Sequence, residues 1–198
     1  GARHYKNCII EVKKQNPEIG LELLCSDLDG NMEALEMLLE ELPLKVFAHN
    51  VECVPRLDSK VRDAKASFEQ SLKILSFARK QRPDLKIKSS LMVGLGETDQ
   101  EILDAMKLLR SSGVDMITLG QYLQPSYKHI PVSRFPEPEK FAIWDGLARD
   151  IGFKAVASGP LVRSSYRAGL LYEESNGGAP VASKNATGSA MTNISHDT

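Results

Sequence analysis

The sequence predicts an α/β protein whose parallel strands form part of a (β/α) barrel of the TIM type. Short apolar runs alternate with segments of helical periodicity, and this rhythm is typical of βαβ units. Each apolar run ends in polar residues, and such folds bind ligands at the carboxyl ends of their parallel strands. Every strand end supplies polar residues and no G-x-G-x-x-G follows a strand, so a barrel fits better than an open dinucleotide-binding sheet.

The first half of the chain is expected to hold three helices and two buried strands. Asn31 suits an N-cap, and Ser67 with Gln70 forms a predicted capping box, so a helix begins after each. Pro17 and Pro43 lie just beyond helix ends. The expected elements are a helix over 4–15, a strand over 21–25, a helix over 32–42, a strand over 46–48 and a helix over 68–78.

The second half continues the alternation and ends in a polar tail. Thr98 and Glu101 form a second predicted capping box, and Pro138 suits the first turn of a helix that Gly152 ends. The expected strands cover 86–93, 114–119 and 153–157, with a helix between each pair. After residue 173 the chain is rich in Gly, Ser, Asn, Ala and Thr, so we expect one domain over 1–173 and a disordered tail over 174–198.

Bulk properties exclude several classes of partner. The net charge of −1 gives no electrostatic reason to expect nucleic acid or an anionic membrane surface. No apolar run approaches the roughly 20 residues that span a bilayer. We therefore expect no nucleic-acid or membrane partners, and we expect a monomer. Because the chain begins with Gly1 and not with Met, we expect it to be a fragment.

The three cysteines predict neither a disulfide framework nor a metal site. Cys8, Cys25 and Cys53 have long, irregular spacings, and none forms a C-x-x-C pair or has a histidine at ligand spacing. We expect all three to be buried small hydrophobes in a reducing compartment. His49 and His129 are likewise expected to be structural.

The strand ends supply candidate binding residues. Asn50 and Glu52 alternate at one strand end, so both side chains point the same way, and an amide with a carboxylate suits a diol such as a ribose, or an amino group. Loop capping is the alternative. Residues 94–97 (GLGE) offer backbone N–H groups without a bulky side chain at the two glycines, which permits close approach of a planar or anionic group.

Two further features have both a structural and a functional interpretation. Lys88 lies inside a strand that should be buried, where lysine is seldom placed for stability, although a solvated strand face would also explain it. Residues 158–166 (SGPLVRSSY) form either a surface turn that ends the domain or part of a site. No nucleophile–base pair and no pair of carboxylates indicates acid–base hydrolysis.

Taken together, these strings resemble lipoyl synthase, a family of radical S-adenosylmethionine (SAM) enzymes. The likeness runs from residue 1 to about residue 172 in the family's order. The strings that carry it are 49–52 (HNVE), 54–57 (VPRL), 91–98 (LMVGLGET), 120–125 (GQYLQP) and 158–166 (SGPLVRSSY).

The resemblance implies a partial (β/α)6 barrel of the radical SAM type, with two of its six strands absent here. It implies SAM and two [4Fe–4S] clusters as cofactors. In the family, one cluster held by C-x3-C-x2-C cysteines cleaves SAM to a radical, which abstracts hydrogen atoms from C6 and C8 of a protein-bound octanoyl group. The auxiliary cluster donates the two sulfur atoms. The implied partner is an octanoylated lipoyl-carrier domain or a glycine cleavage H-type protein.

Site residues follow from the resemblance by position. The auxiliary-cluster ligand would be Ser165, with Ser164 as the alternative, and a serine oxygen is a hard, labile ligand among soft thiolates. Supporting roles fall to Arg56, Lys88, Arg163 and Tyr166. The residues that would face SAM, or the acyl chain at the last two positions, are Asn50, Glu52, Gly94, Gly96, Glu97, Gln121 and Leu123.

The chain departs from the family in one decisive respect, because it contains neither C-x3-C-x2-C nor a second cysteine triad. We therefore expect the chain alone to lack lipoyl synthase activity. Two alternatives stay open: a truncated, non-catalytic isoform that binds acylated carrier domains, and a cluster-free (β/α)-barrel lyase that uses Lys88. The expected location is the mitochondrion, with a plastid or a bacterial cytoplasm as alternatives.

Overall fold

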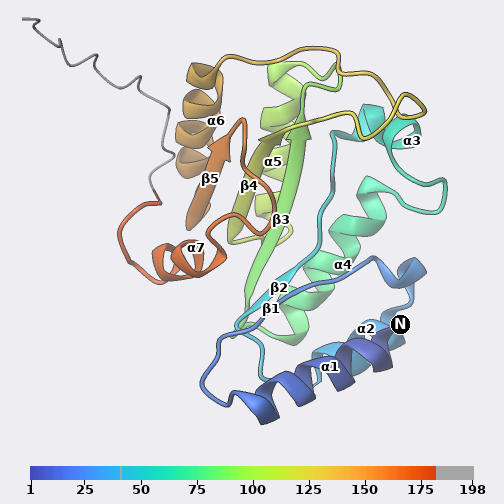
Figure 1. Ribbon diagram of the computed structural model, residues 1–198, viewed down its shortest axis with the longest axis vertical. Helices are drawn as coiled ribbons and strands as arrows, with labels where there is room; N and C mark the ends of the chain where they lie inside the picture. Colours follow the sequence, from blue (N-terminus) through green and yellow to red (C-terminus); the bar gives the residue numbers. More distant parts are fainter. Residues whose placement is uncertain (41, 182–198) are drawn as a thin grey trace, which may run out of the picture.

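A computed structural model describes residues 1–40 and 42–181 of the chain. Within these residues, five parallel strands form one sheet in the order β1-β2-β3-β4-β5 (Figure 1). Each strand pairs with the next strand along the chain, as in the wall of a barrel, so the predicted partial (β/α) barrel is confirmed. The strands are β1 (Glu22–Leu24), β2 (Val46–Ala48), β3 (Lys86–Val93), β4 (Met116–Gln121) and β5 (Ala155–Gly159).

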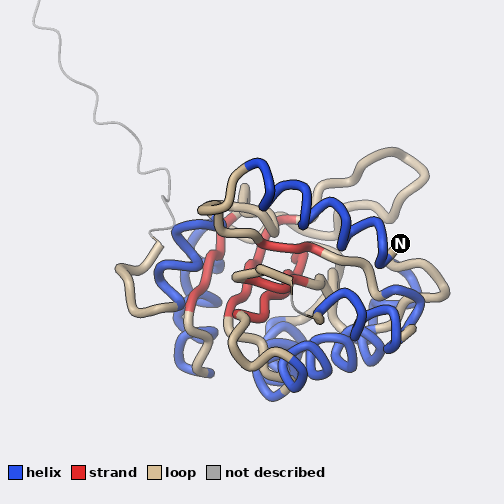
Figure 2. The backbone as a smooth tube through the Cα atoms, turned by 90° about the horizontal axis from the view of Figure 1, so that it is seen from below, coloured by secondary structure: helices blue, strands red, loops and turns tan. Residues whose placement is uncertain are grey.

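Helices surround the central strands (Figure 2). Local sequence sets their ends: the Thr98–Glu101 capping box forms at the start of α5, and Gly152 adopts the left-handed conformation that ends α6. No helix of the described residues combines the length and the apolar character needed to cross a membrane. The helices are α1 (Ala2–Gln15), α2 (Met32–Leu39), α3 (Asp58–Val61), α4 (Phe68–Gln81), α5 (Asp99–Ser111), α6 (Pro138–Ile151) and α7 (Ala168–Ser175), with short 3-10 turns at Leu28–Gly30 and Pro55–Leu57.

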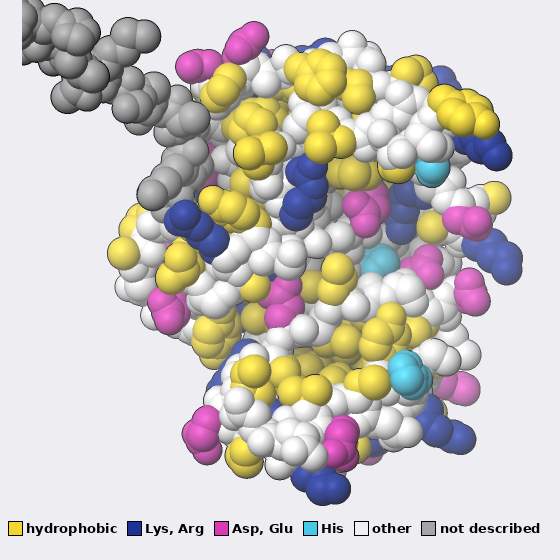
Figure 3. Space-filling model, in the orientation of Figure 1, with side chains coloured by type: hydrophobic (Ala, Val, Ile, Leu, Met, Phe, Trp, Pro, Cys, Tyr) yellow, Lys and Arg dark blue, Asp and Glu magenta, His cyan; other side chains and the backbone are white. Residues whose placement is uncertain are grey.

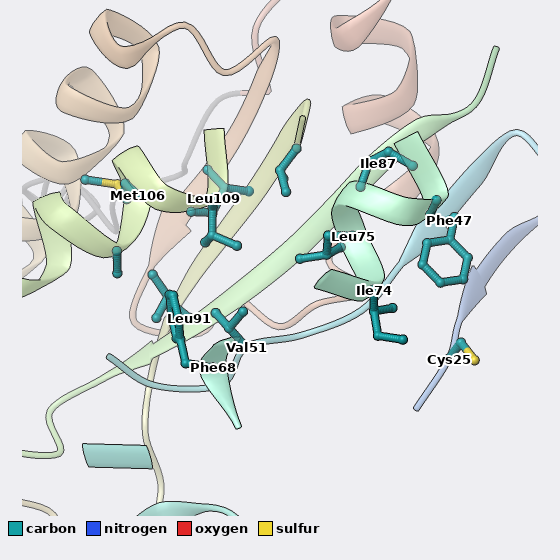
Figure 4. Close-up of a cluster of buried hydrophobic side chains, with 14 of the residues drawn as sticks. Cys25, Phe47, Val51, Phe68, Ile74, Leu75, Ile87, Leu91, Met106 and Leu109 are labelled. Carbon is teal, nitrogen blue, oxygen red and sulfur yellow. The ribbon is translucent and has the colours of Figure 1, made fainter. Parts of the chain in front are cut away.

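The sheet has an outer and an inner face, because successive side chains of a strand point to opposite sides. The outer face carries Phe47, Ile87 and Leu91, which pack with buried residues of α4 and α5 (Figure 4). Buried residues of α2 and α6 belong to the same apolar cluster. The inner face carries a smaller apolar cluster that includes Val46 and Leu171. Because Leu171 belongs to α7, this helix covers part of the inner face (Figure 1).

The strand predictions need two corrections. β4 ends at Gln121 and β5 ends at Gly159, so both strands run about two residues later than their apolar residues indicate. Their ends contain buried glycine and polar residues, which the apolar pattern does not detect. The described residues hold five strands, so a six-stranded barrel would lack one strand and not two.

Three smaller expectations also change. Cys8 is exposed on α1, whereas Cys25 and Cys53 are buried as predicted. Ser67 caps α4, but the Gln70 side chain turns away to the Asp27 carboxylate, so only half of that capping box forms. The helices α3 and α7 were not predicted, because α3 is one turn long and α7 follows a polar loop.

The expected boundary between domain and tail, at residue 174, falls inside α7. Glu174 is buried, and its carboxylate binds Arg149 of α6 and accepts a hydrogen bond from the Val181 N–H. These contacts attach residues 174–181 to the domain. Residues 182–198 of the expected tail lie outside the described residues.

Candidate functional site

A cavity of about 350 Å³ opens at the carboxyl ends of β2, β3 and β4, where parallel folds bind ligands. Figure 3 shows this side of the molecule, hollowed near its centre, with acidic and basic side chains around the hollow. We call it the main cavity. It is lined by Asn50, Glu52, Ser90, Leu91, Met92, Gly120, Gln121, Leu123, Val162, Arg163 and Ser164.

A second cavity of about 300 Å³ adjoins the first at the ends of β1 and β2. Asn50 and Glu52 line both cavities and so form the wall between them. Arg62 adds a positive charge to the side cavity, and Asp27 a negative one. The two cavities together combine apolar lining with charged side chains of both signs.

Asn50 has one side-chain atom whose hydrogen bonding is not satisfied. Its side-chain oxygen is buried and has no hydrogen-bond partner among the described residues. Buried polar atoms are nearly always paired, and an unpaired one costs about 1–3 kcal/mol. In a cavity wall, such an atom is suited to accept a hydrogen bond from a ligand.

Glu52 occupies a strained backbone position beside it. Its φ is 66°, in the left-handed region that only glycine adopts freely. The strain is held by β3, because the Glu52 N–H donates to the Ser90 carbonyl and the Met92 N–H donates to the Glu52 carbonyl. Burial raises the pKa of the Glu52 carboxyl, while the Asn50 side chain and Arg62 act in the opposite direction. Backbone strain of this kind is common where a side chain is held for a ligand.

Residues 94–97 lie near this site but do not line either cavity. The Glu97 carboxylate turns back into its own loop, where it accepts hydrogen bonds from the N–H groups of Gly94 (2.7 Å) and Leu95 (2.8 Å). Both Gly94 and Gly96 have positive φ, so the loop requires glycine at these positions for its conformation. Gly94, Gly96 and Glu97 therefore determine the conformation of the loop at the end of β3.

Gln121 and Leu123 both line the main cavity. The Gln121 side-chain amide donates to the carbonyls of Tyr122 (2.9 Å) and Arg134 (3.2 Å), which fixes its orientation. Leu123 is half exposed, which places an apolar group at the cavity rim. Both residues therefore lie at the main cavity, and their role toward SAM or the acyl chain stays a prediction.

Part of the segment 158–166 packs in the fold, and another part lines the main cavity. Ser158 is buried in β5 and donates a hydrogen bond to the Phe141 carbonyl of α6. Ser164 lines the main cavity, while Ser165 is exposed and does not. Tyr166 packs against the inner-face cluster, and the Arg163 guanidinium donates to the Val162 carbonyl at 2.6 Å. Of the two candidate serines, the structure therefore brings Ser164 to the cavity wall.

Arg56 and Lys88 have structural partners. Arg56 donates to the Glu101 carboxylate and, at 2.8 Å, to the Gly96 carbonyl, so it ties the loop after β2 to the loop after β3. Lys88 is fully buried on the inner face, with its ammonium 2.8 and 3.0 Å from the two Glu22 oxygens. An ammonium held by both oxygens of a carboxylate is not available as a nucleophile, which disfavours the lyase alternative.

His49 is structural, as predicted. Its two ring nitrogens lie 2.9 Å from the Cys25 carbonyl and 2.8 Å from the Ser71 hydroxyl, so both are satisfied. Burial raises the pKa of both the Cys25 and the Cys53 thiols to about 12, which makes them unreactive.

The sequence interpretation did not include Arg62. Its side chain is only 8% exposed, and its guanidinium lies 3.5 Å from Asp58 and 3.0 Å from the Ser71 hydroxyl. These contacts leave donors free toward the side cavity, since a guanidinium has five. A single arginine in a polar loop has no local signal, and only the three-dimensional structure reveals its burial.

Comparison with known proteins shows the relationship of the chain. It is 47% identical to the lipoyl synthase of Marinobacter nauticus over 181 residues, which are 91% of this chain and 52% of that protein. It is 49% identical to the mitochondrial lipoyl synthase of Branchiostoma floridae and 50% identical to the chloroplastic lipoyl synthase of Ricinus communis, each over 172 residues and 87% of this chain. Over the part that it spans, the chain is similar to lipoyl synthases from bacteria, an animal and a plant. The predicted resemblance is confirmed.

The chain spans about half the length of the curated lipoyl synthases it matches, with 52%, 46% and 47% of the three proteins covered. No family model matches it. The lipoyl synthase family implies iron–sulfur clusters and SAM. The described residues contain no group of three or more His, Cys, Asp or Glu side chains that could hold a metal ion.

Proposed function

We propose that this chain forms the SAM-facing and acyl-facing part of a lipoyl synthase, which inserts two sulfur atoms at C6 and C8 of a protein-bound octanoyl group. The observation that carries the proposal is the unpaired, buried Asn50 oxygen in the wall between the two cavities at the strand ends. The identity of 47–50% to proteins named lipoyl synthase supports the same assignment.

The residues of the two cavities fit SAM, which combines a nucleoside with a zwitterionic amino acid. The Asn50 oxygen would accept a hydrogen bond from a ribose hydroxyl or from the amino group of the methionine part. Glu52 would bind the same groups, and Arg62 would hold the methionine carboxylate through its free donors. When bound, SAM supplies the radical chemistry that activates unreactive C–H bonds. The protein's contribution is to orient the cofactor and to exclude water.

The described residues alone do not fit an iron–sulfur cluster. The chain has three cysteines, and their spacing matches no cluster motif. Ser165, or Ser164 as the alternative, is proposed as a ligand to an auxiliary cluster whose cysteine ligands this chain does not supply. Anaerobic reconstitution of the chain with iron and sulfide is expected to give no stable cluster spectrum and no lipoyl product.

The proposed partner is an octanoylated lipoyl-carrier domain or a glycine cleavage H-type protein, whose acyl chain would enter past Leu123. The proposed location is the mitochondrion, with a plastid or a bacterial cytoplasm as alternatives. Relatives named as mitochondrial and as chloroplastic lipoyl synthases support a location of this kind.

The direct test is SAM binding to the chain, measured by equilibrium dialysis. Asn50→Ala is expected to weaken binding about tenfold, because one buried hydrogen bond to the ligand is lost. Asn7→Ala, on the exposed surface of α1, is the matched control and should bind like the parent. Equal SAM affinity of the parent and Asn50→Ala would refute the assignment of Asn50.

Activity is tested in a chimera. The chain matches 54% of the lipoyl synthase of Thermus thermophilus at 48% identity over 174 residues, so it can replace the matching part of that protein. The chimera is expected to restore protein lipoylation in a strain without lipoyl synthase. A folded chimera that binds octanoylated carrier but forms no lipoyl group would instead support the non-catalytic alternative.

A further inference from the structure

Gly120 lies at the cavity end of the inner face, between Met92 of β3 and Gly159 of β5. Its φ is not positive, so the backbone conformation would accept any residue. A Cβ atom at this position would nevertheless overlap the carbonyl oxygen of Val162 and lie 3.1 Å from its carbonyl carbon. The position therefore requires glycine for space and not for conformation.

The chain returns to this point immediately after β5. The Val162 N–H donates to the Gly159 carbonyl at 3.1 Å, which closes a tight turn. The Val162 side chain is 4% exposed and packs in the inner-face cluster with Met116 and Leu171. Val162 is thus anchored on one side by its buried side chain, while its backbone rests on β4 where Gly120 leaves room.

This contact sets the position of the residues that follow. Ser164 lies two residues after Val162 and lines the main cavity, whereas Ser165 is exposed. A methyl group at Gly120 would push the Val162 backbone off β4. Ser164 would move with it, away from the wall that it shares with Gln121 and Met92.

We propose that Gly120 is a positioning residue, which seats the 160–166 segment against β4 and thereby brings Ser164 to the main cavity. Its meaning for the reaction rests on the proposed function, since a serine of this segment is the proposed cluster ligand. The placement of the segment does not depend on that function and can be measured separately.

The measurement uses thiol reactivity in the full chain. Cys25 and Cys53 are buried, with thiol pKa values raised to about 12, so Cys8→Ser leaves a background without a reactive thiol. Ser164→Cys or Ser165→Cys is then added, and the rate of reaction with a disulfide reagent is recorded. In the parent segment we expect Cys at 165 to react at least about tenfold faster than Cys at 164, because only the former is exposed.

Gly120→Ala is expected to reduce this ratio to less than about threefold, because the displaced segment exposes both positions. Gly146→Ala is the matched control, since a Cβ at Gly146 in α6 meets no atom within 4 Å. The ratio should stay at the parent value in that control.

A thermal melt identifies the variants that remain folded. If Gly120→Ala does not fold, Gly159→Ala provides a milder steric conflict with the same segment, because its Cβ would lie 3.3 Å from Val162 Cγ2. A folded variant of Gly120 with an unchanged ratio would overturn the proposal.

The chimera supplies the functional arm. Gly120→Ala should lower lipoyl formation by at least about tenfold more than it lowers SAM affinity, because Asn50 and Arg62 lie on other elements. Loss of both in equal measure would indicate a general structural role and would refute the positioning role. If the unmodified chimera forms no lipoyl group but Gly120→Ala still lowers the ratio of thiol reaction rates, the positioning role of Gly120 is supported and the proposed function is refuted.

Discussion

The two faces of the sheet differ in what they contain, although they are built from the same strands. On the outer face, Ile87, Leu91 and Val93 of β3 meet the helices in a continuous apolar core (Figure 4). On the inner face of the same strand lie Lys88 and Ser90, one in an ion pair and one at the main cavity.

The difference shows which residues specify the fold and which specify the site. The apolar contacts of the outer core are non-directional, so many apolar residues of similar volume could replace the present ones without changing the fold. The inner face depends on directional contacts, because a buried charge or amide is stable only with a particular partner. Substitutions on the inner face should therefore have larger and more specific effects than their size suggests.

The largest effect is expected from Lys88→Met. The change removes the ammonium that satisfies both Glu22 oxygens and leaves a poorly solvated carboxylate on the inner face. We expect a loss of about 3 kcal/mol in the free energy of unfolding, measured by urea denaturation.

The matched control is the double variant Lys88→Met with Glu22→Leu. It replaces both charges by apolar groups, so most of the lost stability should return. If the double variant is as unstable as Lys88→Met alone, the cost comes from packing and not from the unpaired carboxylate.

A smaller effect is expected at Glu52, where the inner face meets the loop after β2. Because φ is 66°, Glu52→Gly should be more stable than Glu52→Ala by about 1 kcal/mol in urea denaturation. Both variants should lose SAM affinity alike, since neither retains the carboxylate.

Glu36 provides the comparison position, because it is an exposed residue inside the regular helix α2. There the order should reverse, with Glu36→Ala more stable than Glu36→Gly by about 1 kcal/mol. The same order at both positions would contradict strain at Glu52.

The outer face could be predicted from the sequence more fully than the inner face. The bounds of β2 and β3 were predicted correctly, because apolar runs and flanking turns are local signals. The capping box at Thr98 and the end of α6 at Gly152 are local as well. By contrast, β4 and β5 were each predicted two residues too early in the chain, since their last residues are buried by a distant segment and not by their own hydrophobicity.

The candidate site depends mostly on contacts that the sequence pattern does not show. Asn50 and Glu52 line a common cavity. Both residues lie beyond the end of β2 at Ala48, and Glu52 has a φ of 66°, so the strand alternation expected from the sequence is not what brings them together. The loop that holds Glu97, the burial of Arg62 and the choice between Ser164 and Ser165 depend on contacts between segments far apart in sequence. Pattern alone does not predict such contacts. The roles of these residues toward SAM and a cluster stay predictions.

The smallest effect is expected on the outer face, at its buried histidine. Burial lowers the pKa of His49 below its usual value, and the Arg62 charge adds to this, while the Cys25 carbonyl and Asp27 oppose it. Above the unfolded-state pKa of about 6.5, both the folded and the unfolded protein carry neutral His49, and stability is complete. As the pH falls below about 6.5, the unfolded state takes up a proton that the folded state resists, so stability declines until the folded pKa is passed.

Urea denaturation of the parent between pH 7.5 and pH 5, values chosen on either side of the unfolded-state pKa, should show this decline in the free energy of unfolding. His49→Gln should reduce the slope of the free energy of unfolding against pH. His129→Gln, on the exposed loop, should leave the slope as in the parent. A slope that is unchanged in His49→Gln would assign the decline to other groups and would leave the outer face without a titrating residue in this range.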